Sequence, residues 1–152
     1  MKLLPALAAA LLLAAPATAQ SVDPTDDGDW WLVAQSADIV ILANGTGRRS
    51  GSRVELDLFV MRRKPHGDMI GTRHRAPIDC AAKTADMWTL AVLYAGRAPL
   101  ALERQGSGMN PVKEPSLAYE FACTEKRAGM RHFANRSRNA VMAEILGEGS
   151  AN

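Results

Sequence analysis

Residues that commonly build catalytic and metal sites are scarce in this sequence. Its 152 residues include two cysteines and three histidines, and only 5% are aromatic. The histidines are not paired at metal-ligand spacing, and no histidine or second cysteine lies at ligand spacing around Cys80 or Cys123. The glycines of residues 44–51 lack the third glycine of a dinucleotide fingerprint and the lysine of a P-loop, and no nucleophile elbow occurs. We therefore expect a non-enzymatic protein with no metal site.

Long apolar runs are missing from the chain except at its start. Met1-Lys2 precedes an uncharged apolar run over residues 3–15, and Ala17-Thr18-Ala19 supplies small residues before Gln20. This pattern predicts a signal peptide over residues 1–19. As a membrane anchor the run would be too short for about 30 Å of hydrocarbon. No cysteine follows it to carry a lipid, so we expect an exported protein with no integral membrane segment after cleavage.

The charge is nearly balanced, which argues against a nucleic-acid partner. The formal net charge is +2, and it becomes +1 when Lys2 leaves with the signal peptide. The charges are nevertheless uneven, because four aspartates mark an acidic leading segment over residues 20–29 and a basic tail follows residue 126. The tail charges indicate a solvated helix face, and a docking surface for an acidic partner is the alternative. The tail arginines are Arg127, Arg131, Arg136 and Arg138.

Both cysteines lie in the mature chain, too far apart for a Cys-x-x-Cys redox motif. Two thiols in an exported domain, with none left over, usually pair, so we predict a Cys80–Cys123 disulfide. It would close a loop of about 44 residues, worth about 4 kcal/mol in the chain-entropy model.

Short β-rich runs separated by turn residues predict an antiparallel meander of about six strands. The clearest is 53–62, where Val54, Leu56 and Leu58 alternate with Glu55 and Asp57. The interruption by a proline in 69–80 predicts an edge or a bulge there. The predicted strands are 30–35, 39–43, 53–62, 69–80, 87–94 and 99–103.

Helical patterns are confined to the last third of the chain. Ser116 is a suitable N-cap for a helix over 117–126, and a second helix is expected over about 135–146, stopped by Gly147. Whether the second helix docks is open at this stage. We predict one α+β domain over residues 30–126, with a C-terminal helix tethered by the disulfide, and a partly helical tail over 127–152.

Five basic residues on two successive predicted strands form a candidate binding patch. They would suit an anionic partner, such as a glycan, an acidic protein or a lipid head group, and ordinary surface charge is the alternative. The patch consists of Arg62, Arg63, Lys64, Arg73 and Arg75. His74 lies between two of these arginines and should face away from both, as a core or surface side chain; the sharper alternative is an axial haem ligand.

The order of several short motifs resembles the surface-adhesin protein E family of small exported proteins from Gram-negative bacteria. The likeness covers roughly residues 30–126. Its motifs, in order, are Trp30 or Trp31, Arg49-Ser50-Gly51, the alternating strand, Asp79-Cys80, Tyr94-Ala95-Gly96, Pro115-Ser116 and Cys123.

This resemblance implies an antiparallel sheet with a disulfide-bridged helix, a role in binding host matrix or plasma proteins, and the option of a homodimer. Haem has also been associated with the family. The missing lipidation cysteine and the tail after Lys126 depart from the family pattern, which leaves a periplasmic location as open as a surface one. We expect a macromolecule-binding envelope protein; a periplasmic structural or stress-related factor and a haem-binding module are the alternatives.

Overall fold

A computed structural model describes residues 27–45, 47–104, 106–113, 116–124, 127 and 129–148. The predicted signal peptide and residues 20–26 of the acidic leading segment lie outside the described residues. Within that part of the chain no helix is long and apolar enough to cross a membrane.

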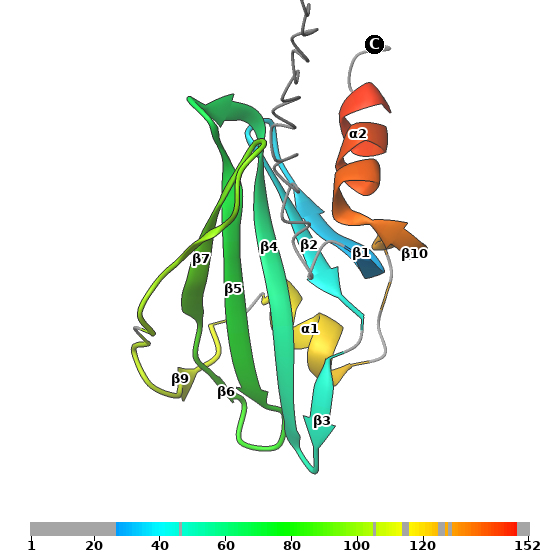
Figure 1. Ribbon diagram of the computed structural model, residues 1–152. Coiled ribbons are helices and arrows are strands. Elements are labelled where there is room, and N and C mark those ends of the chain that lie inside the picture. The colour runs from blue at the N-terminus through cyan, green and yellow to red at the C-terminus, as the bar shows by residue number, and fades with distance from the viewer. Residues whose placement is uncertain are drawn as a thin grey trace, which may run out of the picture.

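The described residues form an antiparallel sheet and two helices, which confirms the α+β class (Figure 1). The long strands follow one another across the sheet, and a strand from the end of the chain joins its β1 edge in the order β10-β1-β2-β4-β5, with β7 also pairing with β5. The long strands are β1 (Asp27–Gln35), β2 (Ile39–Asn44), β4 (Arg53–His66), β5 (Met69–Asp79), β7 (Trp88–Tyr94) and β10 (Arg131–Ser137). The short strands are β3 (Arg48–Ser50), β6 (Thr84–Ala85), β8 (Leu100–Ala101) and β9 (Asn110–Pro111).

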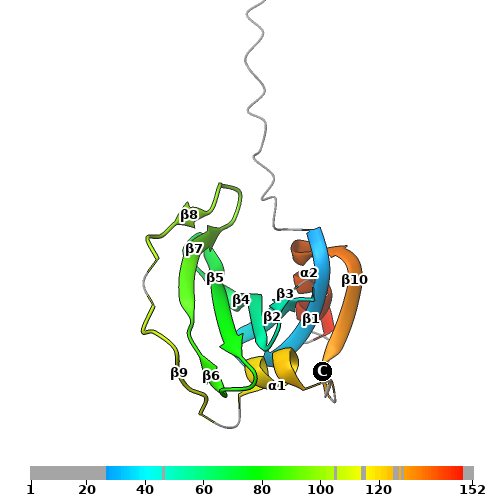
Figure 2. The same cartoon turned by 90° about the horizontal axis from the view of Figure 1, so that it is seen from below.

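Strand alternation gives the sheet two apolar faces. In β4, Leu56 and Leu58 point to one face, while Phe59 and Met61 belong to the cluster on the other. Each face is covered by one helix: α2 (Arg138–Glu148) contributes to the cluster of Phe59, and α1 (Leu117–Cys123) to that of Leu58. The sheet is curved, with α2 on its inner side and α1 on its outer side (Figure 2).

The disulfide ties α1 to the end of β5. Cys80 and Cys123 are bonded, with their Cα atoms 5.4 Å apart, which confirms the predicted pair. Ser116 caps α1 by accepting a hydrogen bond from the Tyr119 backbone, and the Tyr119 hydroxyl donates to the Cys80 carbonyl at 3.1 Å. The cap was predicted from the sequence, but α1 ends at Cys123, earlier than expected.

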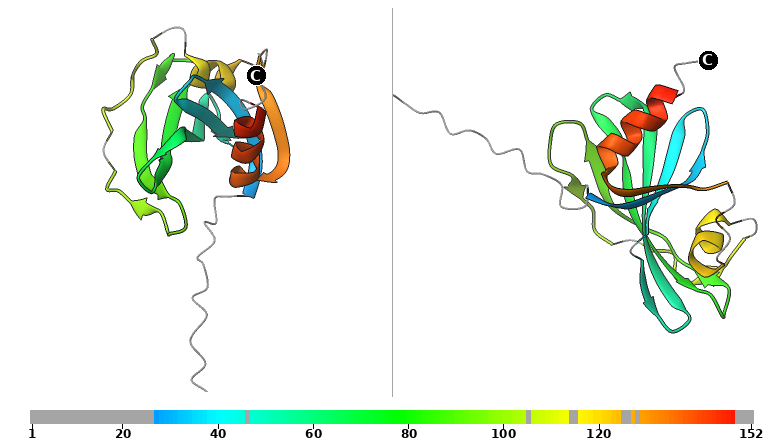
Figure 3. Two further views of the ribbon diagram at one scale, coloured as in Figure 1. Left: turned by 90° about the horizontal axis from the view of Figure 1, so that it is seen from above. Right: turned by 90° about the vertical axis from the view of Figure 1, so that its right-hand side faces the viewer.

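The basic tail docks on the sheet, a question that the sequence left open. β10, which was not predicted, pairs with β1, and α2 follows it from Arg138 onward, three residues later than expected (Figure 3). Phe133, Val141 and Ile145 are all buried in the cluster around Trp30. The tail therefore completes one of the two apolar cores.

Pro77 stands inside the sheet, at a break in pairing. β5 pairs with β7 as far as Arg75 and with β6 from Ile78 onward. Proline has no backbone N–H to donate. It is tolerated at position 77 because neither the β5–β7 pairing nor the β5–β6 pairing includes that residue.

Candidate binding groove

The lower part of the inner sheet face carries polar side chains in place of the apolar core. Asp57, Arg75 and Trp88 lie directly across from one another on β4, β5 and β7. Asp57 accepts from Arg73 at 3.1 Å and from Arg75 at 3.3 Å. These side chains are only 23 to 30% exposed, so one carboxylate balances two half-buried guanidinium groups.

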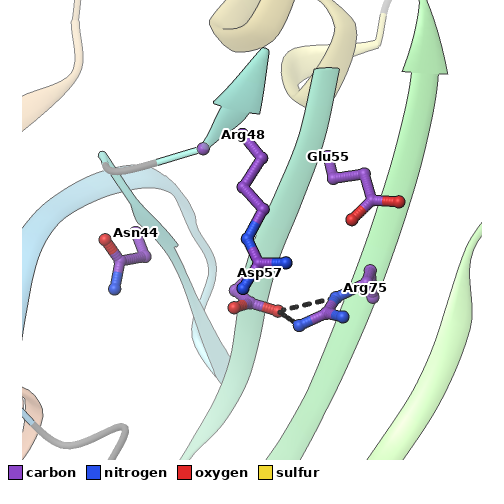
Figure 4. A pocket seen from close by; sticks show the side chains of 6 residues that line it. Asn44, Arg48, Glu55, Asp57 and Arg75 are labelled. Atoms are coloured by element: carbon purple, nitrogen blue, oxygen red, sulfur yellow. Dashed lines mark hydrogen bonds and ion pairs between the residues drawn. The ribbon is translucent and has the colours of Figure 1, made fainter. Parts of the chain in front are cut away.

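A small polar pocket of about 140 Å³ opens beside this row (Figure 4). Arg48 reaches it from β3, where it lies across from Glu55, and Arg75 reaches it from β5. The Arg48 side chain makes no hydrogen bond or ion pair with any other residue that the structure describes. The Arg48 guanidinium can therefore bind an anionic ligand in this pocket without breaking a hydrogen bond to another described residue.

A wider pocket of about 540 Å³ adjoins the small one and shares Arg48 and Glu55 with it. Its floor includes Pro77 and Trp88, one wall is the β3–β4 hairpin, and Arg104 and Met109 line it from the segment after β8. We name the two pockets together the arginine groove. Five arginines and two carboxylates line it: Arg48, Arg49, Arg53, Arg75, Arg104, Glu55 and Asp57.

The arginines of the groove differ in how they are held. Arg49 donates to the Ala122 carbonyl of α1 at 2.7 Å, and Arg53 lies 3.5 Å from Asp79. Arg104 has no hydrogen bond or ion pair within the described chain, and its guanidinium carbon lies 3.3 Å from the centre of the Trp88 ring. Within the part of the chain that the structure describes, each wall of the groove thus presents a cation without a carboxylate partner.

Asp86 fixes the Trp88 ring beneath Arg104. The buried carboxylate accepts hydrogen bonds from the indole N–H of Trp88, from the Met87 backbone and from the Ser107 backbone and hydroxyl. The indole bond is the largest cause that lowers the pKa of Asp86, and it acts against burial, which raises that pKa. The carboxylate thereby joins β7 to the loop that forms one wall of the groove.

The structure separates the candidate patch into two groups. Arg73 and Arg75 face the inner side of the sheet and pair with Asp57. Arg63 donates to the Ser36 carbonyl and to Gln35 at the other end of β4, where Arg62 and Lys64 are exposed. The five residues do not form one surface, and only Arg75 lines the groove. A binding role for Arg62, Arg63 and Lys64 stays a prediction.

His74 faces away from both neighbouring arginines, as alternation indicated. Its Nε2 lies 2.8 Å from the Thr72 hydroxyl and its Nδ1 3.2 Å from the Thr89 hydroxyl, and burial lowers its pKa. To coordinate haem iron, one ring nitrogen of His74 would have to give up its hydrogen bond to a threonine. No three potential metal ligands gather among the described residues.

Sequence reasoning missed the cations that matter most in this groove. Arg48 lies in the 44–51 segment, for which no strand was predicted, and Arg104 lies beyond the last predicted strand. β3 is a strand of only three residues that pairs with the adjacent β4, and Arg104 is placed by its contact with the Trp88 ring on β7, which the local sequence does not reveal. No family model, curated protein or solved structure matches the chain.

Proposed function

We propose that this protein is an exported, non-enzymatic envelope module that binds an acidic macromolecule in the arginine groove. The observation that carries the proposal is a pair of guanidinium groups, those of Arg48 and Arg104, that have no carboxylate partner among the described residues and lie on opposite walls of one groove. Arginine forms bidentate bonds to carboxylates and is weakly hydrated, which suits it to this task.

The surplus of positive charge is local. The whole chain is nearly neutral, whereas five arginines and two carboxylates line the groove, and of these arginines only Arg49 directs its guanidinium to α1. A concave surface of one sign attracts a partner of the opposite sign and orients it during encounter. The disulfide supports an exported protein, and the resemblance to the surface-adhesin protein E family supports a binding role.

The binding test uses fluorescein-labelled poly-L-glutamate and fluorescence anisotropy. The groove variant replaces Arg48 and Arg104 by serine. The control variant replaces Arg62 and Lys64 by serine; these two residues are the rival site from the patch predicted from the sequence, and they are exposed at the other end of β4. Both variants lose two positive charges. We expect the groove variant to bind roughly tenfold more weakly, at about 0.7 kcal/mol for each lost contact.

The control variant should bind nearly as tightly as the native protein, and added salt should weaken native binding. An equal loss in both variants would show a diffuse charge effect, and the groove would then not be the site.

A further inference from the structure

The two ends of the arginine groove differ in chemistry. The small pocket is lined by polar and charged groups, including Asn44 and Asp57. The wider pocket adds Pro77, Trp88 and Met109, which offer apolar surface beside the arginines. An occupant that complements both ends must carry negative charge and an apolar group within a short distance.

The apolar surface continues beyond the groove. Four of the five large hydrophobic side chains that stand exposed among the described residues lie between positions 87 and 109, the stretch that also supplies Trp88, Arg104 and Met109 to the groove. Exposed apolar side chains are characteristic of surfaces that contact a protein partner. They are Met87, Leu100, Leu102 and Met109, of which Met109 lines the groove itself.

These features favour a peptide over the other anions. A sulfated or uronic glycan offers Trp88 and Met109 only the small apolar faces of its sugar rings. A lipid acyl chain needs an enclosed apolar channel, whereas this groove is open and has arginines on both walls. A peptide of acidic residues around an aromatic side chain supplies both kinds of group.

We propose that the occupant is an acidic peptide segment of a protein partner, with an aromatic side chain that stacks on the guanidinium of Arg104. This inference rests on the proposed function. One face of that guanidinium lies over Trp88 at 3.3 Å, and Arg104 is exposed, so its other face can receive a second ring. The charge of Arg104 is attracted to both rings, while its N–H groups at the edge bind a carboxylate.

Asp86 prepares this arrangement before any ligand arrives. It holds the Trp88 indole in place, so stacking needs no ordering of that ring. A platform that is already rigid loses less entropy on binding than a mobile one.

The test compares two labelled peptides, one with tryptophan between two pairs of glutamates and the other with serine in its place. The native protein should bind the tryptophan peptide roughly tenfold more tightly, a difference that a desolvated cation–π contact supplies. In Arg104→Lys the charge remains but the planar group that stacks between two rings is lost, so the preference for the tryptophan peptide should fall well below tenfold.

The control variant is Arg97→Lys. Arg97 also lies over an aromatic ring, at 3.6 Å from the centre of Tyr94, but outside the groove. The tryptophan preference should persist in that variant.

Two results would overturn the inference while poly-L-glutamate binding, and with it the proposed function, stands. One is an equal affinity of the native protein for both peptides. The other is a heparin oligosaccharide that binds the groove more tightly than the tryptophan peptide, which would make the occupant a glycan.

Discussion

Two residues outside the groove determine how Trp88 is presented inside it. Asp86 accepts the indole N–H, and Gly106 lies so close to the ring that a Cβ there would stand well inside 3.0 Å of both Trp88 and the Asp86 carboxylate. The loop can cover the carboxylate only because residue 106 has no side chain.

We predict that Gly106→Ala destabilises the protein by about 1–3 kcal/mol, the usual cost of overpacking. The added methyl must displace either the indole or the loop, and each movement breaks hydrogen bonds to Asp86. Urea unfolding measures the loss. Gly147→Ala is the control, since its Cβ would meet no atom within 4 Å. Equal stability of the Gly106 variant and the native protein would show that the loop does not pack on Trp88.

Asp86 also makes stability depend on pH. Its hydrogen bonds, chiefly that from Trp88, lower its folded pKa below the ordinary value of 3.8, so its contribution is complete above 3.8 and is lost as the pH falls through the folded pKa. The urea midpoint of the native protein should therefore drop more than that of Asp86→Asn between about pH 6 and about pH 3. The pKa of Asp79 is also lowered, which reduces stability at low pH in the native protein and in Asp86→Asn alike, so it does not contribute to the difference between them. Parallel pH profiles would contradict this assignment.

Single residues also show how far the site could be predicted. The alternation in 53–62 and 69–80 correctly set His74 apart from its arginine neighbours, because strand period is a local property. The pairing register between β4 and β5 could not be predicted from the sequence. It places Asp57 across from Arg75, and it leaves Arg62 and Lys64 at the opposite end of β4. The groove depends on that register and on Arg104, so its composition could not be predicted.

At the scale of elements, strands with local periodicity were predicted and the edge strand β10 was missed. Among its residues only Phe133 is buried; Arg131, His132 and Arg136 give it the polar character of a loop or helix face. It becomes a strand because β1 offers it an unpaired edge. The helix after it was predicted, since Val141 and Ile145 are spaced four apart on one face.

The docking of α2 predicts a large cost for truncating its buried face. Ile145 is 3% exposed in the cluster around Trp30. Ile145→Ala should lower the free energy of unfolding by about 2–5 kcal/mol, whereas Asn139→Ala, at an exposed position of the same helix, should change it by less than about 0.5 kcal/mol. Chemical denaturation of both variants gives the comparison. Small, similar effects would mean that α2 does not pack on the sheet.

The disulfide holds α1 against the sheet, as the buried apolar face holds α2. It joins residues 43 positions apart, so replacing Cys80 and Cys123 together by serine should reduce the free energy of unfolding by about 4 kcal/mol in the chain-entropy model. Arg49 in the groove wall donates to a carbonyl of α1, so the variant should also bind poly-L-glutamate less well. Alkylation of the unreduced, unfolded native protein should leave its mass unchanged, and two added labels would show free thiols.

At the scale of the whole molecule, each helix secures a different part of one curved sheet. α2 packs on the inner face around Phe59, and α1 is bonded to the outer side at the end of β5 (Figures 1 and 2). The residues that line the groove come from the strands and from the segment after β8, and none belongs to a described helix. The wall that contains Arg104 is joined to the sheet by short strands and by Asp86. The groove is therefore rigid on its floor and more easily opened along this one wall.

That wall provides a test of location. Arg97 and Arg104 are exposed in segments without long strand ladders, so trypsin should cut the folded protein there before it cuts the central strands. If the protein presents its groove to a partner outside the cell, trypsin added to intact cells should produce the same first fragments while a periplasmic marker survives. This is the outcome we expect for an adhesin-like module. Protection until the outer membrane is opened would contradict it, and the acidic partner would then have to be sought within the periplasm.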